Sequence, residues 1–168
     1  GQTIADGLHF IDRDQPSRAR QVFEGLVASA PTGENHYFLG YYHLTRRDWA
    51  AAEDAFKKGM AADPKNYLNQ IGLASIKVGQ NKVNEAKADF DRILSETKYK
   101  NGDVLHRIAE AYTMFYKLGR DPEFNAHNND PAEAIRLIDL MLEKTKKGPN
   151  AEQMIVRGDA FLIKNDGG

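Results

Sequence analysis

Small residues alternate with large apolar residues along this chain, at intervals that suit pairs of packed helices. The small residues fall where two helices of a hairpin must approach closely, and the large ones fall where the gap between neighbouring hairpins must be filled. No stretch shows the sustained two-residue alternation of β-branched side chains that is typical of a strand. The small positions are Gly7, Gly40, Ala74, Ala109 and Gly158, and the large positions are Phe23, Phe56, Phe90 and Ile138.

Capping residues place the ends of the predicted helices. Asp48 can cap a helix that starts at Trp49, and the run Asp130-Pro131-Ala132-Glu133 indicates an N-cap, a proline in the first turn and a capping box. The predicted helix pairs cover about 2–13 and 16–30, 34–46 and 49–62, 67–79 and 83–97, and 102–118 and 131–146, and a lone ninth helix covers about 151–164.

One group of residues recurs at an offset of 33 or 34 positions. It consists of a small residue, an alanine twelve positions later and a phenylalanine four positions after that. Such a period is typical of a repeat architecture in which each unit is one helix hairpin that buries its apolar surface against the next. The group appears as Gly7, Ala19 and Phe23, as Gly40, Ala52 and Phe56, and as Ala74, Ala86 and Phe90.

Together with Leu39 before Gly40 and the closing Pro64, this group resembles the tetratricopeptide repeat, and the resemblance covers almost the whole chain. The chain departs from that pattern at His36 and Gln70, which take the position of the customary tryptophan. The resemblance implies an all-α fold, namely a right-handed α-solenoid of about four helix hairpins and a C-terminal single helix.

The repeat register implies one domain over residues 1–168. Residues 117–130 do not fit it, because the turn inside the fourth hairpin is about 13 residues longer than the turn inside the second. Long turns in compact domains are uncommon and are often either functional or mobile. The repeats are expected at about 1–32, 33–66, 67–100 and 101–149, with this insertion in the fourth, and a partial repeat is expected at 150–168.

The composition excludes several classes of partner and chemistry. Lys and Arg number 23 and Asp and Glu number 24, so the formal net charge is −1 and nucleic acid is not an expected partner. No run of about 18 apolar residues occurs, so no membrane span is expected. The chain has no cysteine, which removes disulfides, thiolate catalysis and cysteine-ligated zinc.

The sequence contains no familiar catalytic motif. It has no glycine-rich phosphate loop, no Gly-x-Ser-x-Gly and no His-Glu-x-x-His, so neither an enzyme nor a cofactor is expected. His36 and His43 lie seven residues apart in the packing positions of the repeat, and a spacing of four would suit a chelate better. His127 lies among Asp and Asn residues that also suit a turn. No metal site is therefore expected.

The resemblance implies a concave groove, lined by the first helix of each hairpin, in which partners bind. Tyr37 and Tyr41 lie four residues apart on one predicted helix, so an exposed tyrosine stripe is expected there, and tyrosine is a favoured interface residue. The alternative is that each tyrosine packs against a neighbouring repeat. The expected groove residues are Tyr37, Tyr41, Thr45, Ile71, Ser75, His106, Glu110 and Thr113.

The expected function is a non-catalytic scaffold that binds a protein or peptide in this groove. The alternative is a structural module that stacks end to end with another copy or another domain. The predicted last helix carries Ile155, Phe161 and Leu162 without a following partner helix, so self-association through it, or further sequence beyond it, is expected. Residues 2–7 and 63–67 resemble exported bacterial repeat proteins, which implies a periplasmic or cell-envelope location, with the cytoplasm as the alternative.

Overall fold

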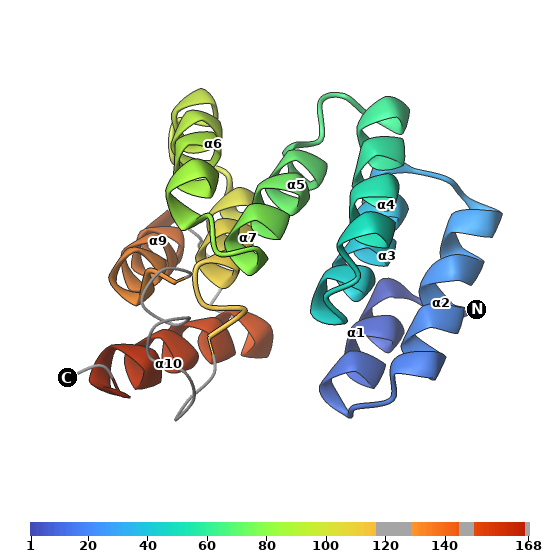
Figure 1. Cartoon of the computed structure of the whole chain (residues 1–168), viewed down its shortest axis with the longest axis horizontal. Helices are drawn as coiled ribbons and strands as arrows, with labels where there is room; N and C mark the ends of the chain where they lie inside the picture. The colour runs from blue at the N-terminus through green and yellow to red at the C-terminus, as the bar shows by residue number, and fades with distance from the viewer. Residues whose placement is uncertain (117–128, 145–149, 167–168) are drawn as a thin grey trace. The chain divides into compact units, whose positions relative to one another are not determined.

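The computed structural model describes residues 1–116, 129–144 and 150–166. Within these residues the chain is helical and contains no strand (Figure 1). The predicted all-α fold of helix hairpins, consistent with an α-solenoid, is therefore confirmed. The chain divides into two compact units, Gly1–Ile76 and Lys77–Gly168. The expectation of a single domain over residues 1–168 stays a prediction.

The first unit consists of two helix hairpins and most of the helix that follows them. Its helices are α1 (Ile4–Asp12), α2 (Pro16–Ser29), α3 (Gly33–Thr45), α4 (Trp49–Ala62) and α5 (Tyr67–Gly79). These bounds agree with the predicted ones within two residues. In Figure 1, α1 lies beside α2 and α3 lies beside α4, and α2 also packs against α3.

The second unit consists of α6 (Val83–Glu96), α7 (Gly102–Ala111), α9 (Pro131–Lys144) and α10 (Ala151–Asp166). α7 packs against α6 and α9, and α10 packs against α9 and α7 (Figure 1). Most of the predicted insertion, residues 117–128, lies outside the described residues, and so do residues 145–149.

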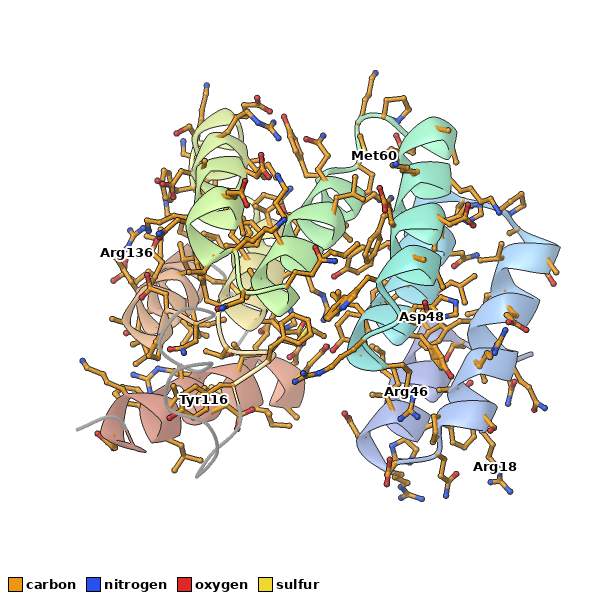
Figure 2. All side chains as sticks on the ribbon, viewed as in Figure 1. Arg18, Arg46, Asp48, Met60, Tyr116 and Arg136 are labelled. Atoms are coloured by element: carbon orange, nitrogen blue, oxygen red, sulfur yellow. The ribbon has the colours of Figure 1, made fainter. Side chains whose placement is uncertain are left out.

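The helix predicted for residues 102–118 is too long, because α7 ends at Ala111. In a continuing helix the carbonyl of Tyr112 would accept the N–H of residue 116. Here it accepts the N–H of Asp130 instead (2.9 Å), while the N–H of Tyr116, labelled in Figure 2, donates to the carbonyl of Thr113 (3.2 Å). The N–H of Thr113 already donates to the carbonyl of Glu110, three residues back, so the regular ladder of α7 ends before the Tyr112 carbonyl meets Asp130.

Both predicted aspartate caps form. Asp48, labelled in Figure 2 at the start of α4, accepts a backbone N–H from the first turn of that helix at 3.2 Å. Asp130 accepts the N–H of Glu133 in the same way (3.1 Å). The return half of the expected capping box does not form, because the N–H of Asp130 is bonded to the end of α7 and the Glu133 carboxylate pairs with Arg136 (2.6 Å).

In the first unit, the ring of Phe56 fills space that two glycines leave open. A Cβ atom added to Gly40 in α3 or to Gly72 in α5 would lie closer than 3.0 Å to a ring carbon of Phe56. Real Cβ atoms do not approach a neighbour so closely, so an alanine at either position would force the helices apart. Phe56 is fully buried and touches both its own hairpin and the helix that follows.

The first hairpin repeats this contact, since a Cβ atom on Gly7 would also lie within 3.0 Å of the ring of Phe23. Phe23 is fully buried, as are Phe90 and Ile138 in the second unit. All four large residues identified from the repeat therefore occupy the core, as the sequence predicts.

A buried amide connects α3, α4 and α5. Asn69, in the first turn of α5, is fully buried, and its Nδ2 donates a hydrogen bond to the backbone carbonyl of Gly33 (3.0 Å). Its side chain also fills the space beside Gly59 in α4, where an added Cβ atom would collide with the amide. A buried polar group that loses its partner costs about 1–3 kcal/mol, so this hydrogen bond helps to fix where α5 packs.

We expect Phe56→Ala to destabilise the protein by about 3–5 kcal/mol, because the change removes a buried ring and leaves a cavity lined by the backbone of two glycine positions. Lys57→Ala is the matched control. Lys57 follows Phe56 in the sequence and its side chain is 65% exposed, so this substitution should change stability by less than about 0.5 kcal/mol. Urea denaturation followed by circular dichroism measures both. If Phe56→Ala unfolds at the same urea midpoint as wild type, the repeat register is wrong.

Candidate functional site

The expected exposed tyrosine stripe is wrong, because both tyrosines are buried. Tyr37 is 3% exposed and Tyr41 is 9% exposed. The ring centroid of Tyr37 lies 5.7 Å from that of Phe56 and 4.9 Å from that of Phe38, so this tyrosine belongs to the aromatic core of the first unit. Its ring contacts lie inside the predicted repeat 33–66, so the alternative interpretation, in which each tyrosine packs against a neighbouring repeat, also stays a prediction. Their part in partner binding stays a prediction.

The other groove residues of the first unit are also largely enclosed. Ile71 and Ser75 are buried, and the Ser75 hydroxyl donates to the carbonyl of Ile71 within α5 (2.7 Å). Thr45 is half-buried, and its hydroxyl donates to the carbonyl of Tyr42 (2.6 Å). Thr45 also lines a small open pocket of about 130 Å³. The pocket is lined by Ile11, Asp14, Pro16, Tyr42, Thr45 and Arg46, of which Arg46 is labelled in Figure 2.

Of the three groove residues predicted in the second unit, His106 and Glu110 lie within α7 and Thr113 lies just after its end. His106 and Thr113 are buried, and Glu110 is half-buried. The Thr113 hydroxyl donates to the carbonyl of Glu110 (3.2 Å). His106 and Glu110 are four residues apart, so they lie one turn apart on the same side of the helix.

A buried arginine joins α7 to α10 at this point. Nη1 of Arg107 lies 3.2 Å from Oε1 of Glu110 and 2.7 Å from Oε1 of Glu152, which stands in the first turn of α10. The Arg107 side chain is only 8% exposed, so water screens these ion pairs weakly. Sequence reasoning placed Glu110 in the groove but missed Glu152, because the repeat register directs attention to other positions of the last helix.

His106 lies in the same cluster. One atom each from His106, Glu110 and Glu152 lie within 4.8 Å of one another. Burial, and then the neighbouring charge of Arg107, lower the pKa of His106 to about 3, so the imidazole is neutral at physiological pH. Among the described residues its Nε2 atom has no hydrogen-bond partner.

The low pKa of His106 makes stability depend on pH. The unfolded chain takes up a proton near pH 6.5, whereas the folded chain does so only near pH 3, so stability falls as the pH drops through this interval. At pH 5 the loss attributable to this group is about 2 kcal/mol. We expect His106→Gln to lose about 2 kcal/mol less than wild type between pH 7.5 and pH 5 in urea denaturation. Equal losses of stability in wild type and His106→Gln would show that the pKa of His106 is not lowered in the folded state.

α10 carries apolar side chains on two opposite sides. One side packs against α7 and α9, and the other is exposed. Among the described residues, the exposed large apolar side chains all belong to this second side, which we call the open face of α10. The packed side contains Val156, Ala160 and Ile163, and the open face contains Met154, Ile155, Phe161 and Leu162.

Gly158 lies in the middle of the open face, four residues after Met154 and four before Leu162. A Cβ atom added there would meet no atom within 4 Å. In contrast, the corresponding glycines of the first unit, Gly7 and Gly40, are each covered by a phenylalanine ring. The open face of α10 therefore has the composition of a hairpin interface, and no helix of the described residues covers it.

No helix in the described part of the chain is both long enough and apolar enough to cross a membrane.

Comparisons with known proteins support the repeat family. Residues 5–67 match the sequence model of the tetratricopeptide repeat. The chain is 27% identical over 82 residues, 48% of its length, to Tetratricopeptide repeat protein 1 of Schizosaccharomyces pombe. It is 30% identical over 76 residues, 44% of its length, to Superkiller complex protein 3 of Mus musculus. The aligned segments span 8% and 5% of those two proteins, so the chain is similar to a small part of each.

Proposed function

We propose that this chain is a non-catalytic tetratricopeptide repeat scaffold that binds a protein partner, and that the open face of α10 holds an amphipathic helix of that partner. Tetratricopeptide repeat domains generally mediate protein–protein interactions, and the matches to residues 5–67 and to two repeat-containing relatives support this class. The single observation that carries the proposal is the exposed apolar surface around Gly158.

The chemistry of the occupant follows from the hairpins of the first unit. There, a glycine in one helix admits a phenylalanine ring from the next, as in the contacts of Gly7 with Phe23 and of Gly40 with Phe56. Gly158 offers the same recess, flanked by Ile155 and Leu162, which are each 57% exposed. A partner helix with one aromatic residue and flanking aliphatic residues would remove these side chains from water, at about 25 cal/mol for each Å² buried.

The groove predicted from the repeat is a finer part of this proposal. Of its eight residues, Thr45 and Glu110 are half-buried, while the others are buried. Thr45 and Glu110 are therefore the groove side chains that we propose to touch a partner. The buried tyrosines would contribute indirectly, by packing in the core that positions α3.

Gly158→Leu separates partner binding from folding. The added side chain enters open space, and leucine favours a helix over glycine by about 1 kcal/mol, so folding should be retained or strengthened. The same side chain blocks the close approach of a partner helix. We expect affinity capture with the purified full chain, quantified by mass spectrometry, to recover at least tenfold less partner, which corresponds to about 1.4 kcal/mol.

Gly25→Leu is the matched control, because Gly25 is also an exposed helical glycine whose added Cβ would meet nothing within 4 Å. It should capture partners as well as wild type does. Equal capture by the two leucine variants would place the binding site away from α10, and Thr45 and Glu110 would then be the next positions to change.

The alternative occupant of the open face is a second copy of the chain, as in a module that stacks end to end. Sedimentation equilibrium distinguishes the two cases. A wild-type dimer that Gly158→Leu converts to a monomer would favour assembly, whereas a monomer at all concentrations would favour a different protein.

A cell-envelope location also stays a proposal, supported by the resemblance of residues 2–7 and 63–67 to exported bacterial repeat proteins. Fractionation of cells that express the full-length protein tests it, and recovery only from the cytosol would reject it.

A further inference from the structure

His106, Glu110 and Glu152 form the kind of side-chain set that binds metal ions. His106 and Glu110 are one helical turn apart on α7, which brings an imidazole nitrogen and a carboxylate to the same side of the helix. Glu152 comes from the first turn of α10, which packs against α7. One potential ligand atom of each residue lies within 4.8 Å of the others, close enough for a single ion to contact all three after small side-chain rotations.

We propose that these three residues bind a divalent first-row transition cation, for which Zn²⁺ is the natural probe. The cluster lies on the side of α10 that packs against α7, away from the open face, and Glu110 is the one residue that it shares with the side chains proposed to touch a partner.

The buried histidine provides a second observation that points to a ligand. The His106 side chain is 3% exposed, and its Nε2 atom finds no hydrogen-bond partner in the described part of the chain. A buried imidazole nitrogen left without a partner costs free energy, and such atoms are uncommon in folded proteins. A cation bound through Nε2 would give this atom a partner and would remove that cost.

The two carboxylates of the cluster attract a cation. Glu110 and Glu152 carry two negative charges, and Arg107 supplies one positive charge within 3.2 Å of both. Arg107 contacts the Oε1 atom of each carboxylate and so holds the two groups side by side. The Glu152 carboxylate has two oxygens, so it can keep its arginine contact through Oε1 and offer its other oxygen to an ion. The arginine charge still opposes a cation, which predicts moderate affinity.

The mixed ligand set selects the class of ion. An imidazole nitrogen with two carboxylate oxygens suits Zn²⁺ and neighbouring transition metals. Mg²⁺ and Ca²⁺ prefer ligand sets made entirely of oxygen. Three protein ligands leave a position open on a tetrahedral ion, which a water molecule or a partner side chain would fill.

Isothermal titration of the full chain with zinc chloride tests the proposal, with magnesium chloride as the ion control. We expect one equivalent of Zn²⁺ to bind with a Kd of about 10 μM or tighter, and no binding of Mg²⁺. His106→Gln and Glu152→Gln should each weaken Zn²⁺ binding at least tenfold. Glu152→Gln decides the matter if His106→Gln does not fold, since the Glu152 side chain is 36% exposed and Arg107 keeps its ion pair with Glu110 in that variant.

Two histidine controls make the result specific. His36 is also buried and has an unpartnered ring nitrogen among the described residues, but it is not part of the cluster, so His36→Gln should bind Zn²⁺ like wild type. His127 lies outside the described residues in a stretch rich in Asp and Asn, and His127→Ala should also bind like wild type. The proposal is overturned if wild type shows no binding at 100 μM Zn²⁺, if Glu152→Gln binds unchanged, or if His127→Ala abolishes the binding.

Discussion

The contact between a phenylalanine ring and glycine backbone sets how closely the helices of the first unit approach. Phe56 presses against Gly40 in α3 and Gly72 in α5, so one side chain determines the spacing of three helices. Removing a fully buried phenylalanine costs about 3–5 kcal/mol, which is a large share of the 5–15 kcal/mol that stabilises a typical domain. The aromatic residues of α3, including Tyr37, then pack around this ring and are drawn into the core.

The junction of α7 with α10 is held together in a different way, because it combines apolar packing with a buried ionic cluster. An ion pair in such a place adds little net stability, since desolvation offsets most of its attraction. Its loss is nevertheless costly, because the remaining charges are left unpaired. Arg107 therefore acts mainly as a positional constraint, which fixes the first turn of α10 beside Glu110. The opposite side of α10 remains exposed.

The sequence predicts the helices well because their determinants are local and periodic. Phe23, Phe56, Phe90 and Ile138 stand in the core at the positions that the repeat indicates. The end of α7 was not predictable in this way, because the backbone after it pairs with Asp130, a residue eighteen positions beyond Tyr112.

The candidate site was harder to predict than the fold. Buried residues occur on every side of α3, so the spacing of Tyr37 and Tyr41 did not reveal which side faces water. The cluster at Arg107 joins residues more than forty positions apart, and no periodic pattern connects them. The spacing of His106 and Glu110 was visible in the sequence, but without Glu152 it indicated a groove surface and not a ligand set.

The buried amide of Asn69 has a consequence for how like repeats recognise their proper neighbours. Repeats that share the same apolar positions can pair in the wrong order during folding, since hydrophobic contact alone discriminates poorly between similar surfaces. Asn69 meets the carbonyl of Gly33 and the bare backbone of Gly59 only when α5 follows α3 and α4 in the native order. In a shifted pairing the amide would lose this hydrogen bond and would be buried against apolar side chains. This one polar side chain thus penalises misassembled stacks, in which its Nδ2 atom would lose the Gly33 carbonyl.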